Sequence, residues 1–304
     1  MGDGGTRSLQ AGRSERLAVA AHGASTPAHP RPGRAQRLPG FGLSLGVTLS
    51  VLAFLVVIPL TALLVMLARA PLAHTLEVLS AERTLAAYGL SFGASVAAAL
   101  IAMPLGLAIA WTLARYDVPG RRVLDALVDL PFAMPTAVSG IALTYLWGPE
   151  GPAGRVLGTL GIEVSFTRVG IVLALVFVSL PFVVRTVQPV IEDFPVEVEE
   201  AARALGASRA QTFRRVIFPA LRPALFAGAT LAFARAVGEY GSVVFIAGNV
   251  PFRTEIAPLL VLVRLEEYDY AGAAAVATGM LVASGVMLVM LARAERGSRR
   301  GARA

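Results

Sequence analysis

Long apolar stretches separated by short polar segments dominate the chain. No charged residue lies between Arg37 and Arg69, or between Arg83 and Arg115. A helix needs about 20 mostly apolar residues to cross the hydrocarbon core of a bilayer, and each of these stretches is longer than that. The apolar windows predict six membrane-spanning helices, at about residues 41–68, 87–114, 127–148, 169–190, 221–247 and 271–292.

The composition agrees with a membrane protein and excludes several kinds of chemistry. Hydrophobic residues make up 56% of the chain, against roughly 45–50% in soluble domains, so we expect an all-α polytopic membrane protein. There is no cysteine, which excludes disulfides and thiolate metal sites. All 27 basic residues are arginine, so the chain lacks the lysine of a phosphate-binding Walker loop. Any nucleotide energy must therefore come from another polypeptide.

Arginine is unevenly distributed between the two sides of the predicted membrane. Cytoplasmic loops carry an excess of basic residues. Twenty arginines fall on the side that holds both termini and the polar segment at about 195–220, and only six fall on the opposite side. We therefore expect both termini and this segment to be cytoplasmic. These arginines at the ends of spans explain the net charge of +7, and we expect no nucleic-acid partner.

The two ends of the chain are predicted to be tails. Residues 1–40 are rich in glycine, alanine, serine, proline and arginine and have no apolar periodicity, a composition typical of disorder. We interpret them as a disordered basic N-terminal tail, with weak attraction to anionic membrane lipid as the functional alternative. Residues 41–295 form the predicted transmembrane domain, and residues 296–304 form a cytoplasmic C-terminal tail.

The polar segment at about 195–220, called the coupling segment below, predicts two short helices outside the bilayer. Apolar positions spaced three and four apart indicate a first helix, namely Val198, Ala201, Ala202 and Leu205. Gly206 is placed to end that helix in a left-handed cap. Ser208, with Gln211 three residues later, predicts a capping box for the second helix. Such an element either docks a soluble partner or lies on the membrane surface as an amphipathic linker.

The coupling segment resembles the EAA motif of bacterial ABC importer permeases, EAA-x3-G-x9-I-x-L-P. The residues that match are Glu200, Ala201, Ala202, Gly206 and Pro219. Val216 and Phe218 depart from the motif, where it has isoleucine and leucine, but they keep its apolar character. By this resemblance, the segment sits in a cleft of an ATPase subunit and carries the closure of that subunit into the membrane.

The resemblance extends over nearly all of residues 38–295. The stretches LDALVDLPFAMPTAVSGIAL (124–143), PFVVRTVQPVIEDF (181–194), FARAVGEYGSVVFIAGNVPFRTEIAPLL (233–260) and RLEEYDY (264–270) resemble the T-type permeases of sulfate/thiosulfate importers. This implies a type I ABC importer permease fold with six spans, in a bacterial inner membrane. It also implies a second related permease subunit, two ATP-binding subunits on the cytoplasmic face and an extracytoplasmic sulfate-binding protein. The chain itself would need no cofactor and would not be an enzyme.

Three alternatives stay open on the sequence. One is an intramembrane enzyme, for which the chain lacks paired acids, a Ser/His constellation or metal ligands. Molybdate permeases share the R-x-x-G-E-[FY]-G pattern found here at Arg235–Gly241, so molybdate or another oxyanion is the alternative substrate. An ion-driven carrier acting alone would need an acidic site in the middle of the membrane. Glu239 is the candidate for such a site.

Several residues within the spans are candidates for a translocation path. A charge at the bilayer centre costs about 2.5–3.5 kcal/mol, and Arg235 and Glu239 are spaced to pair on one helix face. Such a pair either contacts a passing oxyanion or orients the helix as a structural ion pair. Hydroxyl donors could assist the oxyanion or could bond between helices, and these are Thr136, Ser139 and Ser179.

Overall fold

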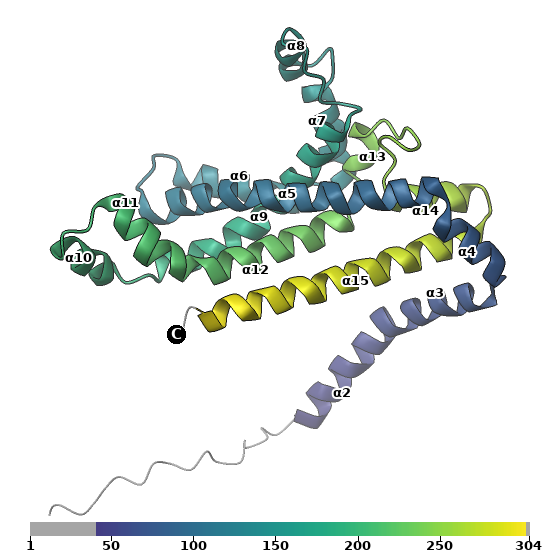
Figure 1. Ribbon diagram of the computed structural model, residues 1–304, viewed down its shortest axis with the longest axis horizontal. Coiled ribbons are helices and arrows are strands. Elements are labelled where there is room, and N and C mark those ends of the chain that lie inside the picture. The colour runs from purple at the N-terminus through teal and green to yellow at the C-terminus, as the bar shows by residue number, and fades with distance from the viewer. Residues whose placement is uncertain (1–40, 302–304) are drawn as a thin grey trace, which may run out of the picture. The chain divides into compact units, whose positions relative to one another are not determined.

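The computed structural model describes residues 41–301, and their regular elements are all helical (Figure 1). The predicted disordered tail, residues 1–40, lies outside this range. The chain divides into two compact units, with the boundary between Ile58 and Pro59. In the first unit, the described elements are α2 (Phe41–Leu52) and the π-helical turn η1 (Ala53–Val57). The second unit holds the remaining elements and is the part that positions the functional residues.

The second unit is an assembly of long and short helices. In chain order these are α3 (Ile58–Arg69, which starts one residue before the boundary), α4 (Leu72–Ser80), α5 (Glu82–Arg115), α6 (Arg121–Ala133), α7 (Thr136–Trp147), α8 (Pro152–Gly158), α9 (Arg168–Glu192), α10 (Val196–Ala204), α11 (Arg209–Thr212), η2 (Phe213–Ile217), α12 (Phe218–Val237), α13 (Val243–Ile246), α14 (Ala257–Glu266) and α15 (Tyr270–Gly301).

Five helices in the described part of the chain are long and apolar enough to span a membrane. They are Phe41–Arg69, Glu82–Arg115, Arg168–Glu192, Arg209–Val237 and Tyr270–Arg293. Helices α6 and α7 pass the same test together and are bent by 114°. The predicted all-α polytopic fold is therefore confirmed, with six spans if the bent pair counts as one.

The third predicted span, at 127–148, is wrong as a single helix. Met134 has φ −91° and ψ 135°, an extended conformation that ends α6. Pro135 explains this break, because the ring of a proline disfavours helical geometry at the residue before it. Helix α7 then starts afresh at Thr136.

The fifth predicted span, at 221–247, is also corrected at both ends. Its helix begins in the coupling segment, at Arg209, and ends at Val237. The π turn η2 precedes Pro219, and Phe218 N–H donates to Phe213 O, five residues back. A proline lacks an N–H and clashes with the carbonyl four residues earlier, so a widened turn lets the helix continue past it.

Helices α5, α9 and α12 pack together to form the centre of the second unit (Figure 1). Their shared apolar cluster includes Leu113, Val187, Leu221 and Phe233, each at most 2% exposed. Gly106 and Gly228 allow close approach, because a Cβ at either would lie within 3.0 Å of Val183. Small residues at such positions are typical of helices packed within membranes.

Candidate functional site

The coupling segment forms the helix–glycine–helix element that the sequence predicts. Helix α10 ends at Ala204, and Gly206 has a φ of +84°. Gly206 N–H donates to Arg203 O, and Ala207 N–H donates to Ala202 O, which closes the helix end. The side chains of Ser208 and Gln211 form a reciprocal capping box at the start of α11. The local prediction is therefore confirmed in its helices, its cap and its capping box.

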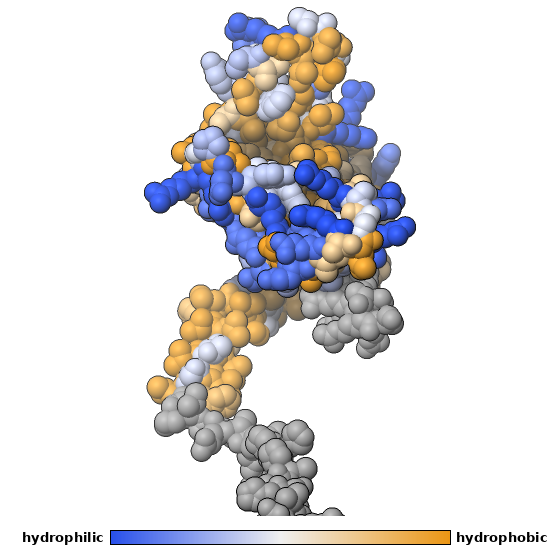
Figure 2. All heavy atoms as spheres, turned by 90° about the vertical axis from the view of Figure 1, so that its left-hand side faces the viewer, coloured by the Kyte–Doolittle hydropathy of each residue, from blue (hydrophilic) through white to orange (hydrophobic). Residues whose placement is uncertain are grey.

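Most of the motif residues in the coupling segment are exposed. Glu200, Ala201 and Gly206 are exposed, and Ala202 is half-buried. Leu205 is 89% exposed, the highest value among the large apolar side chains of the described residues. Figure 2 shows hydrophilic residues gathered on the end of the molecule where Figure 1 places α10 and α11. The segment thus presents the apolar side chain of Leu205 within a charged surface. Pro219, at the start of α12, is half-buried.

Glu199, next to Glu200, has the opposite environment and was missed by the sequence analysis. It is 8% exposed, and its Oε1 lies 2.7 Å from Nη2 of Arg115 at the end of α5. Arg203 Nη2 lies 3.5 Å from the other carboxylate oxygen of Glu199. The sequence did contain a signal for this contact, a second acidic residue directly before the motif. Because neighbouring side chains on a helix point about 100° apart, Glu199 and Glu200 cannot both face the same partner.

Arg235 and Glu239 form an ion pair, as their spacing predicts, with 2.6 Å between Nη1 and Oε2. However, α12 ends at Val237, so Glu239 lies beyond the helix and does not share its face. The Glu239 side chain is 2% exposed, and its Oε1 accepts hydrogen bonds from the backbone N–H and the hydroxyl of Ser242. The Arg235 side chain is 31% exposed. Glu239 is thus fully satisfied, whereas Arg235 keeps access to its surroundings.

The hydroxyl candidates differ in their positions. A Cβ at Gly241 would overlap Thr136 Oγ1, and a Cβ at Gly140 would meet the backbone of Ser242. The start of α7 therefore packs directly on the loop that holds Glu239. Ser139 is buried and donates to Pro135 O at 3.4 Å. Ser179 is buried in α9 and donates to Val176 O at 3.5 Å. Of the three hydroxyls, Thr136 has the clearest contact with the Glu239 loop.

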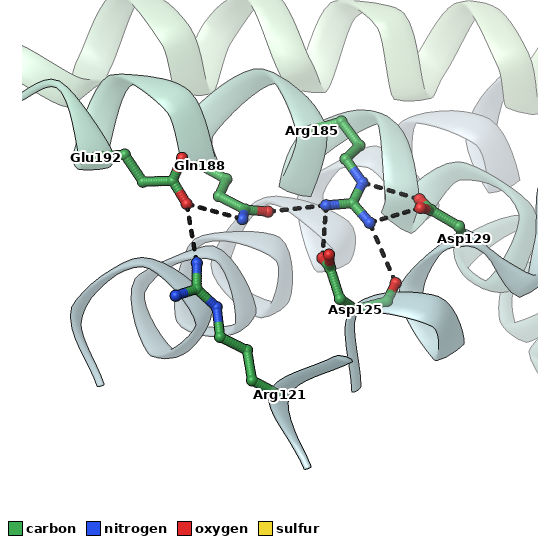
Figure 3. Close-up of polar contacts among 6 residues, drawn as sticks. All are labelled: Arg121, Asp125, Asp129, Arg185, Gln188 and Glu192. Atoms are coloured by element: carbon green, nitrogen blue, oxygen red, sulfur yellow. Dashed lines mark hydrogen bonds and ion pairs between the residues drawn. The ribbon is translucent and has the colours of Figure 1, made fainter. Parts of the chain in front are cut away.

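A second charged site, which we call the α6 clasp, joins Asp125 and Asp129 of α6 to Arg185 of α9 (Figure 3). Arg185 Nε and Nη2 donate to the two oxygens of Asp129 at 2.8 and 2.6 Å. Its Nη1 donates to Asp125 Oδ1 at 2.7 Å and to Gln188 Oε1 at 3.0 Å. The sequence analysis predicted none of these contacts. Two features of the sequence could have indicated the clasp. Asp125 and Asp129 are four residues apart, and Arg185 lies inside a predicted span, where it needs an acidic partner.

Ion pairs also tie together the end of the second unit opposite the coupling segment. Arg83 pairs with Glu255 at 2.6 Å, and Asp269 binds both His74 and Arg264. Burial alone would raise the pKa of the Asp269 carboxyl. Hydrogen bonds from the Gly272 N–H, His74 and Arg264 outweigh it and hold the pKa below its usual range. Among the described residues, no group of three or more His, Cys, Asp and Glu side chains could hold a metal ion.

Comparisons with known proteins agree on one family. The family model of the binding-protein-dependent transport system inner membrane component matches residues 102–300. The sulfate transport system permease protein CysT of Salmonella typhimurium is 47% identical over 251 residues, which cover 83% of this chain and 91% of that protein. The protein of the same name from Synechococcus elongatus is 46% identical over 240 residues, which cover 79% of this chain and 86% of that protein.

A solved structure supports the fold. The crystal structure of a bacterial ABC transporter involved in the import of the acidic polysaccharide alginate matches with a TM-score of 0.68 at 15% identity. The match covers 86% of this chain and 96% of that one. At this level of identity the likeness concerns the fold alone.

The family assignment also fixes what kind of subunit this is. The family description places the protein in an inner membrane, in agreement with the apolar helices. A permease subunit of this family provides a membrane path and is not itself an enzyme. The chain belongs to the family of binding-protein-dependent transport system inner membrane components, the permease subunits of ABC importers.

Proposed function

We propose that this chain is the membrane permease subunit of an ATP-driven importer of sulfate and thiosulfate. The observation that supports sulfate as the substrate is the 47% identity, over 83% of the chain, to a sulfate transport permease. A binding-protein-dependent importer takes its substrate from an extracytoplasmic binding protein. Here that partner would be a sulfate-binding protein.

The coupling segment is the proposed docking site for the ATP-binding subunits. Its support is the exposed tip formed by Glu200, Ala201, Gly206 and Leu205, on an end rich in hydrophilic residues. The other two motif residues, Ala202 and Pro219, are half-buried. ATP binding would close a pair of ATPase subunits and shift the population of the permease between two access states. A second, related permease subunit would supply the other half of the path.

The translocation path would pass the loop that follows α12. Arg235 is partly exposed and is paired with a buried carboxylate. The pairing weakens its hold on a dianion, and transit requires binding that is weak enough for release. Thr136 and Ser139 at the start of α7 are proposed to supply hydroxyl donors next to this pair. Ser179 is a further candidate, further along the path.

The proposed orientation puts the coupling segment and both termini in the cytoplasm. It is supported by the excess of arginines on this side. Figure 1 also draws the end of α15 toward the same end of the second unit as α10 and α11.

Uptake of labelled sulfate tests the proposal. Cells lacking this chain, and any other sulfate importer, would be compared with the same cells carrying it, with excess thiosulfate or molybdate as competitors. We expect uptake to depend on the chain and to be blocked by thiosulfate. Uptake that molybdate blocks and thiosulfate does not would move the substrate to molybdate. Uptake that needs no ATPase partner would instead support an ion-driven carrier.

A further inference from the structure

The cytoplasmic end of α5 contacts both halves of the coupling segment. Trp111 and Arg115 lie four residues apart at the end of α5, so they share one face of the helix. Arg115 Nη2 lies 2.7 Å from Glu199 Oε1 on α10. The Trp111 ring meets the ring of Phe213 edge-on, with centroids 5.5 Å apart. Since Phe213 belongs to η2, the two sides of the segment meet at one point on the bundle.

The Arg115–Glu199 pair is shielded from water. The side chains are 19% and 11% exposed, and charges in such surroundings attract more strongly than exposed pairs. The Arg115 guanidinium also lies 5.6 Å from the centre of the Trp111 ring, a cation–π contact. Arg203, the other partner of Glu199, is 58% exposed and lies on α10 itself. The charged contact that holds α10 to a membrane helix is therefore the one with Arg115.

The geometry of this pair differs from that of a rigid clamp. Although Arg115 Nη2 and Glu199 Oε1 are close, they lack the alignment of a hydrogen bond, and the buried Nε of Arg115 has no hydrogen-bond partner. In the α6 clasp, by contrast, Arg185 holds Asp129 through two aligned hydrogen bonds. Two parallel hydrogen bonds fix the angle between a guanidinium and a carboxylate. An ion pair without them tolerates a change in that angle. A tilt of α10 would therefore leave its attachment to α5 intact.

We propose that the Arg115–Glu199 ion pair, seated on Trp111, is the joint through which movement of α10 reaches the membrane helices. This rests on the proposed function, in which Glu200 faces an ATPase subunit. The adjacent residue, Glu199, then passes the movement to α5. Because α5 is packed against α9 and α12 through a common apolar cluster, displacement of its end is carried into the bundle. Arg115 and Glu199 are positioning residues and contact no substrate.

The test separates ATP hydrolysis from import in the complete importer. Glu199→Gln, Arg115→Gln and the exchange variant Arg115→Glu with Glu199→Arg would be purified with their partners and placed in proteoliposomes. For the single variants we expect normal copurification of the ATPase subunit and hydrolysis within about two-fold of wild type. Sulfate imported per ATP should fall about ten-fold, the size of a typical coupling energy between sites. The exchange variant should regain part of this ratio.

Arg122→Gln is the matched control. It removes one positive charge on the same side of the membrane from an exposed residue at the start of α6. It should keep the wild-type ratio of import to hydrolysis.

Two results would overturn the inference. One is a wild-type ratio in both single variants. The other is a proportional loss of assembly, hydrolysis and import, which would make the pair a structural anchor only. Failure of the wild-type chain to hold any ATPase subunit is a different result, because it would overturn the proposed function before any variant is made.

Discussion

At the scale of single residues, the turn after α10 depends on one backbone conformation. Gly206 has a φ of +84°, and a Cβ added there would meet no atom within 4 Å. A side chain at this position would therefore have enough room. What favours glycine here is the left-handed backbone conformation. That conformation costs a residue with a side chain roughly 1–2 kcal/mol, and asparagine less than most.

The effect of substituting Gly206 should depend on how well the new residue tolerates a left-handed backbone. Gly206→Val should reduce sulfate uptake several-fold because the β-branched side chain disfavours the turn, while Gly206→Asn should keep most of it. Uptake in cells, normalised to the amount of protein in the membrane, measures the difference. Equal uptake by the two variants would contradict this explanation of the glycine.

The charge of Glu200 gives a second prediction at this scale. Glu200→Arg places a positive charge on the exposed face proposed to dock the ATPase subunit, so it should abolish uptake while insertion in the membrane stays normal. Asp117→Arg makes the same change of charge in the loop between α5 and α6, which is also exposed, and should have little effect. Normal transport by the Glu200 variant would argue against docking at this face.

Asp269 provides a prediction of pH dependence. Its pKa is lowered in the folded protein, so its contribution to stability is present at neutral pH. That contribution is lost as the pH falls from about 4, the usual value for aspartate, through the lower folded pKa. Thermal unfolding in detergent should show Asp269→Asn to be less stable than wild type at pH 7, with a difference that shrinks as the pH falls below about 4. A difference that grows on acidification would contradict the direction of the shift.

At the scale of elements, α6 is a helix between two breaks that the α6 clasp holds in place. Gly120 before it has a φ of +78°, and the bend of 114° to α7 follows it. The polar contacts to α9 run from Arg185 to Gln188, then to Glu192 and Arg121 (Figure 3). The clasp therefore ties to α9 a helix that has a break in the chain direction at each end.

Removing the central arginine should loosen α6. Arg185→Gln leaves Asp125 and Asp129 facing each other without a counter-charge. The aspartates are 44% and 48% exposed, so we expect a loss of about 1–2 kcal/mol, below the cost of breaking a fully buried pair. Unfolding temperature in detergent measures it. Arg121→Gln, in an exposed pair at 3.3 Å, is the control and should cost less than about 0.5 kcal/mol. Equal effects would contradict the central role of Arg185.

Local signals predicted the elements better than their contacts. The capping box at Ser208 and the cap at Gly206 depend on neighbours in the sequence and were predictable. The apolar window at 127–148 did not show the bend, because hydropathy averages over Pro135 and over Asp129 alike; the local signal for the bend was Pro135 itself. Arg115 and Glu199 are far apart in the sequence, so only the fold brings them together. For the same reason, the partner of Arg185 could not be predicted.

At the scale of the whole molecule, the chain is a permease subunit of an ABC importer, and we propose that its coupling segment docks the partner that supplies the energy. The absence of lysine excludes a Walker loop in this chain, and family membership assigns it the permease role. In the proposed mechanism, a partner hydrolyses ATP and the coupling segment converts that hydrolysis into import.

Import into proteoliposomes tests this claim most directly. The assembled importer would be supplied with ATP on the side of the coupling segment and with sulfate-loaded binding protein on the other side. We predict accumulation of labelled sulfate that requires hydrolysable ATP and disappears in the Glu200→Arg variant. Accumulation driven by a proton or sodium gradient without ATP, or unaffected by Glu200→Arg, would contradict it.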